Sequence, residues 1–209
     1  MAECYPLNCI LLCGGQSSRM GCPKYAMLLD GKSAATRLVD RIREAHPSAE
    51  TIYISLHDRS QSVDSLDGNG FYYLYDEQDR TLPDSYAGPA AGLLAAYHLD
   101  RTAHWLVVAC DYPLISAADL RQLIENYESP ITCFENAQGW PEPLLAVWSP
   151  AALQNLEENV CRGKTGPIKV VEAVSTKRLK PQDERSLMNT NTPAEWEAAL
   201  RAAGEVFGS

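Results

Sequence analysis

A glycine-rich loop with two cations is the part of this sequence whose residue types are best suited to chemistry. It covers residues 12 to 24 and reads LCGGQSSRMGCPK. The adjacent Gly14 and Gly15 let consecutive backbone N–H groups point at one anion, while Arg19 and Lys24 bring positive charge to the same loop. Neither the Walker pattern nor the dinucleotide-binding glycine pattern is present. The loop therefore predicts a phosphate site, with a plain turn as the alternative.

Acidic and amide side chains later in the chain could complete such a site. Asp111 ends a continuously apolar run, where a lone carboxylate is costly unless it is paired or binds a metal. Because Mg²⁺ prefers one or two carboxylates plus phosphate oxygens, Asp111 is a candidate magnesium ligand, with a helix cap or salt bridge as the alternative. Asp76 follows another apolar run. Asn189 and Asn191 offer two amides on alternate positions, although a turn is the simpler interpretation of that pair.

Short apolar runs alternate with helical patterns along the chain and would position these residues. Strands are expected at residues 8–12, 51–55, 71–75 and 104–110. Helices are expected to begin at the caps Ser33, Ser116, Ser149 and Thr192, with a further helix of small residues at 88–97. Because successive parallel strands need long crossover connections, this alternation predicts an α/β fold with a mainly parallel sheet. The loop, Asp76 and Asp111 should then converge at the carboxyl edge of the sheet.

The composition fits one ordinary globular domain. The 209 residues are 45% hydrophobic, and we expect a single domain over residues 1–209. The sequence has neither a long apolar run nor a signal-peptide pattern, which predicts a cytoplasmic chain with no membrane segment. A net charge of -9 argues against a nucleic-acid binder, although the basic segment 162–180 could hold an anionic substrate or be a solvated face. Seven scattered cysteines without a C-x-x-C pair are expected to be reduced structural thiols.

Several motifs, taken in chain order, resemble those of one known family. They are Leu12-Cys13-Gly14-Gly15, Ser18-Arg19-Met20-Gly21 with Lys24, Gly88-Pro89-Ala90-Ala91-Gly92, Cys110-Asp111-Tyr112-Pro113, Pro143-Leu144 and Asn189-Thr190-Asn191-Thr192-Pro193. Together they cover nearly the whole chain and resemble the MobA family of molybdenum cofactor guanylyltransferases. The loop is typical of the wider nucleotidyltransferase superfamily, and the remaining motifs are typical of MobA-like members.

The resemblance implies a three-layer, Rossmann-like nucleotidyltransferase fold that transfers GMP from GTP to the phosphate of molybdopterin and releases pyrophosphate. It implies catalytic roles for Lys24, Asp111 and Arg19, with Asp111 also binding Mg²⁺. The nucleotide-binding residues that it implies are Leu12, Cys13 and Gly14 at the guanine and ribose, Gly15 and Lys24 at the phosphates, Asp76, and Asn191 at the edge of the site. GTP, molybdopterin and proteins that supply or accept the cofactor would be the partners.

Some positions bear on which base and which acceptor are used. Gly14 favours a purine, because cytidylyl-transferring relatives tend to have alanine there. Ser55-Leu56-His57, however, lies where guanylyl-transferring members commonly carry an asparagine. Glu142 stands where many members have a neutral residue, and it could hydrogen-bond a pterin ring or be an ordinary surface carboxylate. The alternatives are therefore transfer of CMP or another nucleotide to a different phosphorylated acceptor, and nucleotide binding without turnover.

Overall fold

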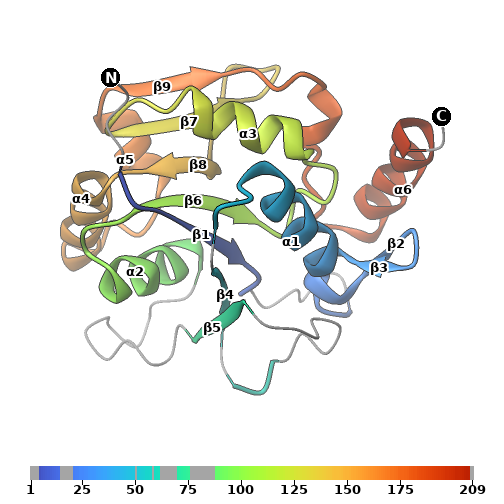
Figure 1. Cartoon of the computed structure of the whole chain (residues 1–209), viewed down its shortest axis with the longest axis horizontal. Coiled ribbons are helices and arrows are strands. Elements are labelled where there is room, and N and C mark those ends of the chain that lie inside the picture. Colours follow the sequence, from blue (N-terminus) through green and yellow to red (C-terminus); the bar gives the residue numbers. More distant parts are fainter. Residues whose placement is uncertain are drawn as a thin grey trace.

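A seven-stranded sheet forms the centre of the computed structural model (Figure 1). The structure describes residues 5–14, 21–49, 51–57, 59–61, 70–75 and 88–207, with side chains up to residue 204. The strands, in spatial order, are β5 (Phe71–Tyr75), β4 (Ile52–Leu56), β1 (Leu7–Leu12), β6 (His104–Ala109), β8 (Pro141–Trp148), β7 (Ile131–Glu135) and β9 (Thr176–Leu179). β8 runs antiparallel to both of its neighbours, and the other paired strands of this sheet are parallel. The predicted mainly parallel sheet is confirmed.

Helices cover both faces of this sheet and make a three-layer α/β fold. The helices are α1 (Ala34–Ala45), α2 (Pro89–Leu99), α3 (Ala117–Glu125), α4 (Pro150–Cys161), α5 (Ile168–Ala173) and α6 (Pro193–Phe207). α1 and α3 pack together on one face, while α2, α4 and α5 lie on the other (Figure 1). α6 stands apart from both layers, close to the short ribbon of β2 (Leu28–Leu29) and β3 (Lys32–Ser33). Within the described part of the chain, none of the helices could span a membrane.

The predicted helix starts are confirmed by their capping hydrogen bonds. The hydroxyls of Ser33, Ser116 and Ser149 each accept a bond from the backbone N–H three residues later. Before α6, Thr192 and Glu195 exchange bonds between side chain and backbone N–H in a capping box. The expected strands lie within one residue of β1, β4, β5 and β6 at each end. β7, β8 and β9 were not among the predicted strands.

A buried carboxylate attaches the C-terminal segment to α3. Asp119 is 1% exposed and accepts hydrogen bonds from the hydroxyls of Ser116 and Ser186, at 2.5 and 2.7 Å. The backbone N–H groups of Ser116 and Gln182 also donate to it, at 3.2 and 3.1 Å. These donors satisfy a charge that would otherwise be costly to bury. Because residues 182–186 lead into the segment 189–191, Asp119 fixes the path by which that segment returns to the sheet.

The helix α2 lies close to the sheet because it carries glycine at the point of contact. A Cβ added at Gly92 would lie 2.5 Å from Ser55 Oγ and 2.7 Å from Leu12 Cδ2. Both neighbours are buried, Ser55 one residue before the end of β4 and Leu12 at the end of β1. Gly92 therefore sets the distance between α2 and the strand ends from which the glycine-rich loop departs.

We expect Gly92→Ala to lower the free energy of unfolding by about 1 to 2 kcal/mol. Overpacking a core costs about 1 to 3 kcal/mol, and the better helix propensity of alanine returns up to about 1 kcal/mol. Gly204→Ala in α6 is the matched control, because its Cβ would meet nothing within 4 Å. Urea denaturation measures both variants. A Gly92→Ala protein as stable as the Gly204→Ala protein would contradict the close packing of α2.

Candidate active site

The carboxyl ends of β1 and β6 bring two predicted site segments to the same edge of the sheet. Leu12 pairs with Ala109 at the last register position of these parallel strands. The pairing continues past the strands, because Cys110 donates its backbone N–H to Leu12 O at 3.0 Å. The chain on one side continues through Gly14 into the glycine-rich loop, and on the other it reaches Asp111. Residues 12–14 at the start of the loop therefore leave the sheet beside Asp111, which is the part of the predicted convergence that the described residues cover.

Lys24 joins Asp111 to the C-terminal segment at this edge. Its Nζ donates to Asp111 Oδ1 at 2.9 Å and to Asn191 Oδ1 at 2.6 Å. The Lys24 side chain is 12% exposed and that of Asp111 is 30% exposed, so the ion pair is partly shielded from water. The three residues are far apart in the sequence, yet one ammonium group contacts both oxygen atoms. This cluster forms the centre of the candidate site.

A short, well-anchored turn places Lys24. Lys24 begins the 3-10 helix η1 (Lys24–Ala26), and Gly21 before it has a φ of 72°, a value that favours glycine. Tyr25 is buried at 4% exposure, and η1 packs against α1. Behind the turn, Ala34 donates its N–H to Met27 O at 2.8 Å. The backbone around Lys24 is therefore fixed by α1, and the side chain reaches from it toward Asp111.

The segment carrying Asn191 is held from both sides. Thr190 is fully buried, and its backbone N–H and its hydroxyl donate to Asp111 O at 2.9 and 3.2 Å. On the other side, the Glu195 carboxylate accepts the backbone N–H groups of Asn191 and Thr192, at 2.7 and 2.8 Å. The bond from the Asn191 N–H is the main reason that the pKa of Glu195 lies below its usual value. Asn191 is thereby presented to Lys24 on a rigid turn.

Further hydrogen bonds lie between Asn191 and the hairpin that joins β7 to β8. Asn191 Nδ2 donates to Asn189 Oδ1 at 2.6 Å, and the Asn189 side chain acts to lower the pKa of the Tyr112 hydroxyl. Tyr112 Oη donates to Glu142 Oε2 at 2.6 Å, and Asn136 Nδ2 donates to Glu142 Oε1 at 3.0 Å. Burial, followed by the neighbouring Glu142 carboxylate, raises the pKa of Tyr112, so its hydroxyl stays protonated as a donor.

Two buried thiols lie beneath this edge. Cys13 and Cys110 are both buried, and the Cys110 thiol also lies 3.7 Å from Asp111 Oδ1. The hydrogen bond with Cys13, together with burial, raises the pKa of Cys110 well above its ordinary value. A protonated thiol is a poor metal ligand, since the thiolate is the form that binds metals. All six described cysteines are free, in line with the expectation of structural thiols, and Cys4 lies outside the described residues.

The structure brings some predicted site residues together and does not describe others. Lys24, Asp111 and Asn191 are in direct contact, and Leu12, Cys13 and Gly14 leave β1 beside them. Gly15, Arg19 and Asp76 lie outside the described residues, and their roles stay predictions. Sequence reasoning missed that Tyr112 and Glu142 meet. Both positions stood within or beside family motifs, but a separation of 30 residues gives no sign of contact.

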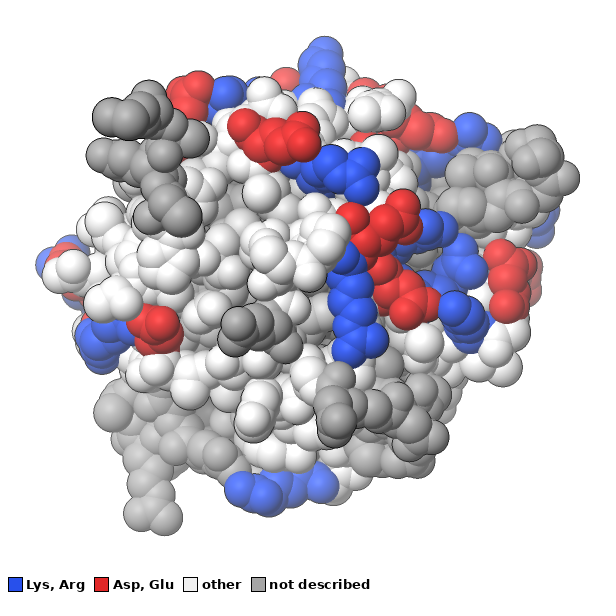
Figure 2. Space-filling model, in the orientation of Figure 1, with Lys and Arg blue, Asp and Glu red and all other residues white. Residues whose placement is uncertain are grey.

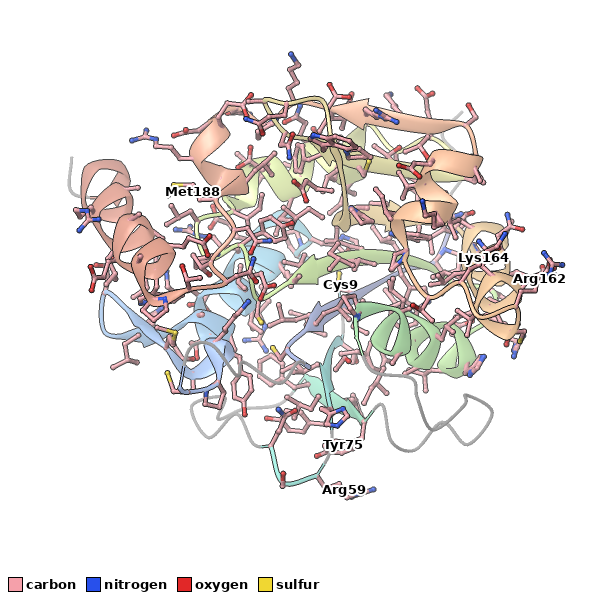
Figure 3. The ribbon with its side chains drawn as sticks, turned by 180° about the vertical axis from the view of Figure 1, so that it is seen from behind. Cys9, Arg59, Tyr75, Arg162, Lys164 and Met188 are labelled. Atoms are coloured by element: carbon pink, nitrogen blue, oxygen red, sulfur yellow. The ribbon has the colours of Figure 1, made fainter. Side chains whose placement is uncertain are left out.

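The basic segment 162–180 is largely balanced by acidic neighbours. Its ion pairs are Arg162 with Glu158, Lys169 with Glu172, Lys177 with Glu128 and Arg178 with Glu135. Figure 3 shows Arg162 and Lys164 on the side of the molecule opposite Met188, which adjoins the segment 189–191. On the face drawn in Figure 2, basic and acidic side chains are likewise interleaved. These contacts favour the solvated face over the anion site.

Comparisons with known proteins point to one family. The chain is 35% identical to the molybdenum cofactor guanylyltransferase of Rhizobium meliloti, over 71% of this chain and 66% of that protein. It is 28% identical to the molybdenum cofactor biosynthesis bifunctional protein of Synechocystis sp., over 91% of this chain and 53% of that protein. The chain thus spans about half the length of the Synechocystis protein and just under two thirds of that from Rhizobium.

A solved structure shares the fold, and a family model matches most of the chain. The molybdopterin-guanine dinucleotide biosynthesis protein A of Archaeoglobus fulgidus superposes with a TM-score of 0.72, at 21% identity, over 95% of this chain and 99% of that chain. At this identity the likeness concerns the fold alone. The model of the MobA-like NTP transferase domain matches residues 9–183. The chain therefore belongs to the MobA-like NTP transferase family, whose nucleotidyltransferase fold it adopts.

Proposed function

We propose that this protein transfers GMP from GTP to the phosphate of molybdopterin and releases pyrophosphate. The observation that carries the proposal is the contact of Lys24 with Asp111 and Asn191 at the carboxyl edge of the sheet, beside the start of the glycine-rich loop. A cation and a carboxylate at this place are what the transfer of an anionic group requires. The family and the activities named for the curated relatives support the same reaction.

The reaction needs positioning and charge compensation more than acid–base chemistry. An oxygen of the acceptor phosphate attacks the α-phosphorus of GTP and forms a new P–O bond. The bond from that phosphorus to the bridging oxygen of pyrophosphate breaks, and its electron pair leaves with pyrophosphate. Because the acceptor phosphate is already an anion, no general base is needed. The protein has to hold two anions in line and reduce their repulsion.

In this mechanism each described site residue has a limited task. Lys24 places its positive charge beside the triphosphate and the departing pyrophosphate. Asn191, held by its backbone, keeps the Lys24 ammonium at the sheet edge. Gly14 follows Leu12 and Cys13 and is exposed, so the base and ribose can approach the backbone there. The tasks of Arg19, Gly15 and Asp76 rest on the resemblance alone.

Asp111 fits the role of the magnesium ligand. Among the described residues, the side chains that reach its carboxylate are Lys24 and the weak donor Cys110, both at Oδ1, and the group is 30% exposed. The described part of the chain has no cluster of three or more His, Cys, Asp or Glu side chains that could hold a metal by themselves. Mg²⁺ commonly takes one or two carboxylates and completes its shell with phosphate oxygens and water. A bound Mg²⁺ would supply charge stabilisation at the phosphates.

Lys24→Ala should lower kcat for pyrophosphate release by about 10²- to 10³-fold, the loss seen when one preorganised electrostatic contact is removed. The same assay should show a similar loss for Asp111→Asn. Lys32→Ala is the matched control, because Lys32 also pairs with an aspartate, Asp40, but both side chains are about half exposed. Retention of more than a tenth of the wild-type kcat by a folded Lys24→Ala protein would contradict the assigned role.

Pyrophosphate release from GTP and molybdopterin should stop when EDTA is added and return when Mg²⁺ is supplied in excess. Asp111→Asn should require a higher Mg²⁺ concentration for half-maximal rate, because a neutral amide is a poorer ligand for a hard cation. The Mg²⁺ titration of wild type and variant is the measurement. Full activity in EDTA, or an unchanged midpoint in Asp111→Asn, would remove Asp111 from the metal site.

Gly14→Ala should reduce kcat/KM for GTP more than that for CTP, because a Cβ at this position takes space from the larger base. Pyrophosphate release with GTP, CTP, ATP and UTP in parallel measures the preference. Equal losses for GTP and CTP would remove the argument for a purine. Wild-type turnover with CTP but not GTP, or turnover with a different phosphorylated acceptor only, would replace the proposed reaction by one of the alternatives.

A further inference from the structure

Glu142 is a carboxylate at the start of β8, close to the candidate site. It is the second residue of β8, which runs antiparallel to β6, so the start of β8 lies at the edge where β6 ends. In its strand pairing Glu142 faces Phe134 of β7 and is only partly exposed. It is therefore the acidic side chain that β8 delivers to the site edge, where it contacts Tyr112, the residue after Asp111.

Polar side chains linked by hydrogen bonds lie between Lys24 and Glu142. The Lys24 ammonium donates to Asn191, Asn191 donates to Asn189, and Tyr112 donates to Glu142. The cation thus lies at one end of these contacts and the carboxylate at the other. The bonds from Tyr112 and Asn136 hold the Glu142 carboxylate in place.

The Glu142 carboxylate is oriented and still has capacity to bind. Each of its oxygens accepts one bond from a described residue, Oε2 from Tyr112 and Oε1 from Asn136. A carboxylate oxygen can accept two hydrogen bonds, so each retains a position for another donor. Two parallel acceptor positions on a fixed plane match two adjacent N–H groups on the edge of a planar ring. They repel phosphate and ring carbonyl oxygens.

From this arrangement we infer that Glu142 determines acceptor specificity by binding the N–H edge of the acceptor's pterin ring. The inference rests on the proposed function, because that function supplies a pterin acceptor. The 2-amino group and the adjacent ring N–H of a pterin are two donors that can fill the remaining acceptor positions of the carboxylate. The phosphate end of the acceptor is attracted to Lys24 and repelled by Glu142, so the two ends of the network orient the acceptor. Tyr112 and Asn136 act as positioning residues that hold the carboxylate plane.

Equilibrium binding tests this without turnover. The probes are 6-hydroxymethylpterin monophosphate and 6-hydroxymethyllumazine monophosphate. At ring position 2 the pterin carries an amino group, which donates, and the lumazine carries an oxygen, which accepts. Isothermal titration calorimetry should show that the wild-type protein binds the pterin about 10- to 100-fold more tightly, as expected for loss of a hydrogen bond to a charged group. Glu142→Gln should lose most of this preference, because its amide presents a donor to the ring. Tyr112→Phe should keep an intermediate preference.

Glu135→Gln is the matched control for the removed charge. Glu135 ends β7 in the same hairpin but pairs with Arg178 and not with Tyr112 or Asn136. The Glu135→Gln protein should keep the wild-type preference for the pterin. Thermal unfolding of each variant checks that it is folded. A wild-type protein that binds both probes equally, or a Glu142→Gln protein that keeps the preference, overturns the inference.

The same samples separate this inference from the proposed function. Pyrophosphate release with GTP and molybdopterin, but equal binding of the two probes, would leave the reaction in place and remove Glu142 as the specificity residue. A pterin preference that depends on Glu142, without any pyrophosphate release, would support ring recognition and reject the transferase reaction. For an active enzyme, Glu142→Gln should raise KM for molybdopterin by about 10- to 100-fold and leave KM for GTP within about 2-fold.

Discussion

One ammonium group with two oxygen partners ties the candidate site together. A partly buried charge is costly unless it is compensated, and Lys24 is compensated by Asp111 and Asn191 from segments 87 and 167 residues away. The contact can form only when the sheet, the turn before α1 and the C-terminal segment are all in place. The site is therefore a product of the complete fold, and no single motif of the sequence contains it.

The topology of the sheet explains how such distant residues meet. Parallel strands β1 and β6 end at the same edge and deliver the glycine-rich loop and Asp111 there. β8 is antiparallel, so it delivers the residue at its beginning, Glu142, to that edge. The C-terminal segment has no strand to guide it. The buried Asp119 and the fully buried Thr190 fix its path instead.

The site has an electrostatic direction as well as a shape. A cation lies at one end of this row of polar side chains and a carboxylate at the other, with amides and a tyrosine hydroxyl between them. A substrate with a phosphate at one end and N–H donors at the other fits this polarity in one orientation only. An acidic protein with a net charge of -9 can thus attract a phosphate locally without a broad basic surface.

The sequence by itself determined the features that depend on neighbouring residues, and tertiary structure decided those that depend on the path of the chain. Apolar runs predicted β1, β4, β5 and β6, and serine caps predicted α1, α3 and α4. Both signals are local, because the pattern of apolar residues and the capping hydrogen bond each involve only a few neighbouring residues. β8 was missed because Pro141 and Pro143 argue against a central strand. In the structure, Pro141 is the first residue of β8, and Pro143 lies where the pairing of β8 with β7 is interrupted. The hydrogen bonds of Lys24 with Asn191 and of Tyr112 with Glu142 follow from packing. No local spacing in the sequence encodes which distant side chains will meet.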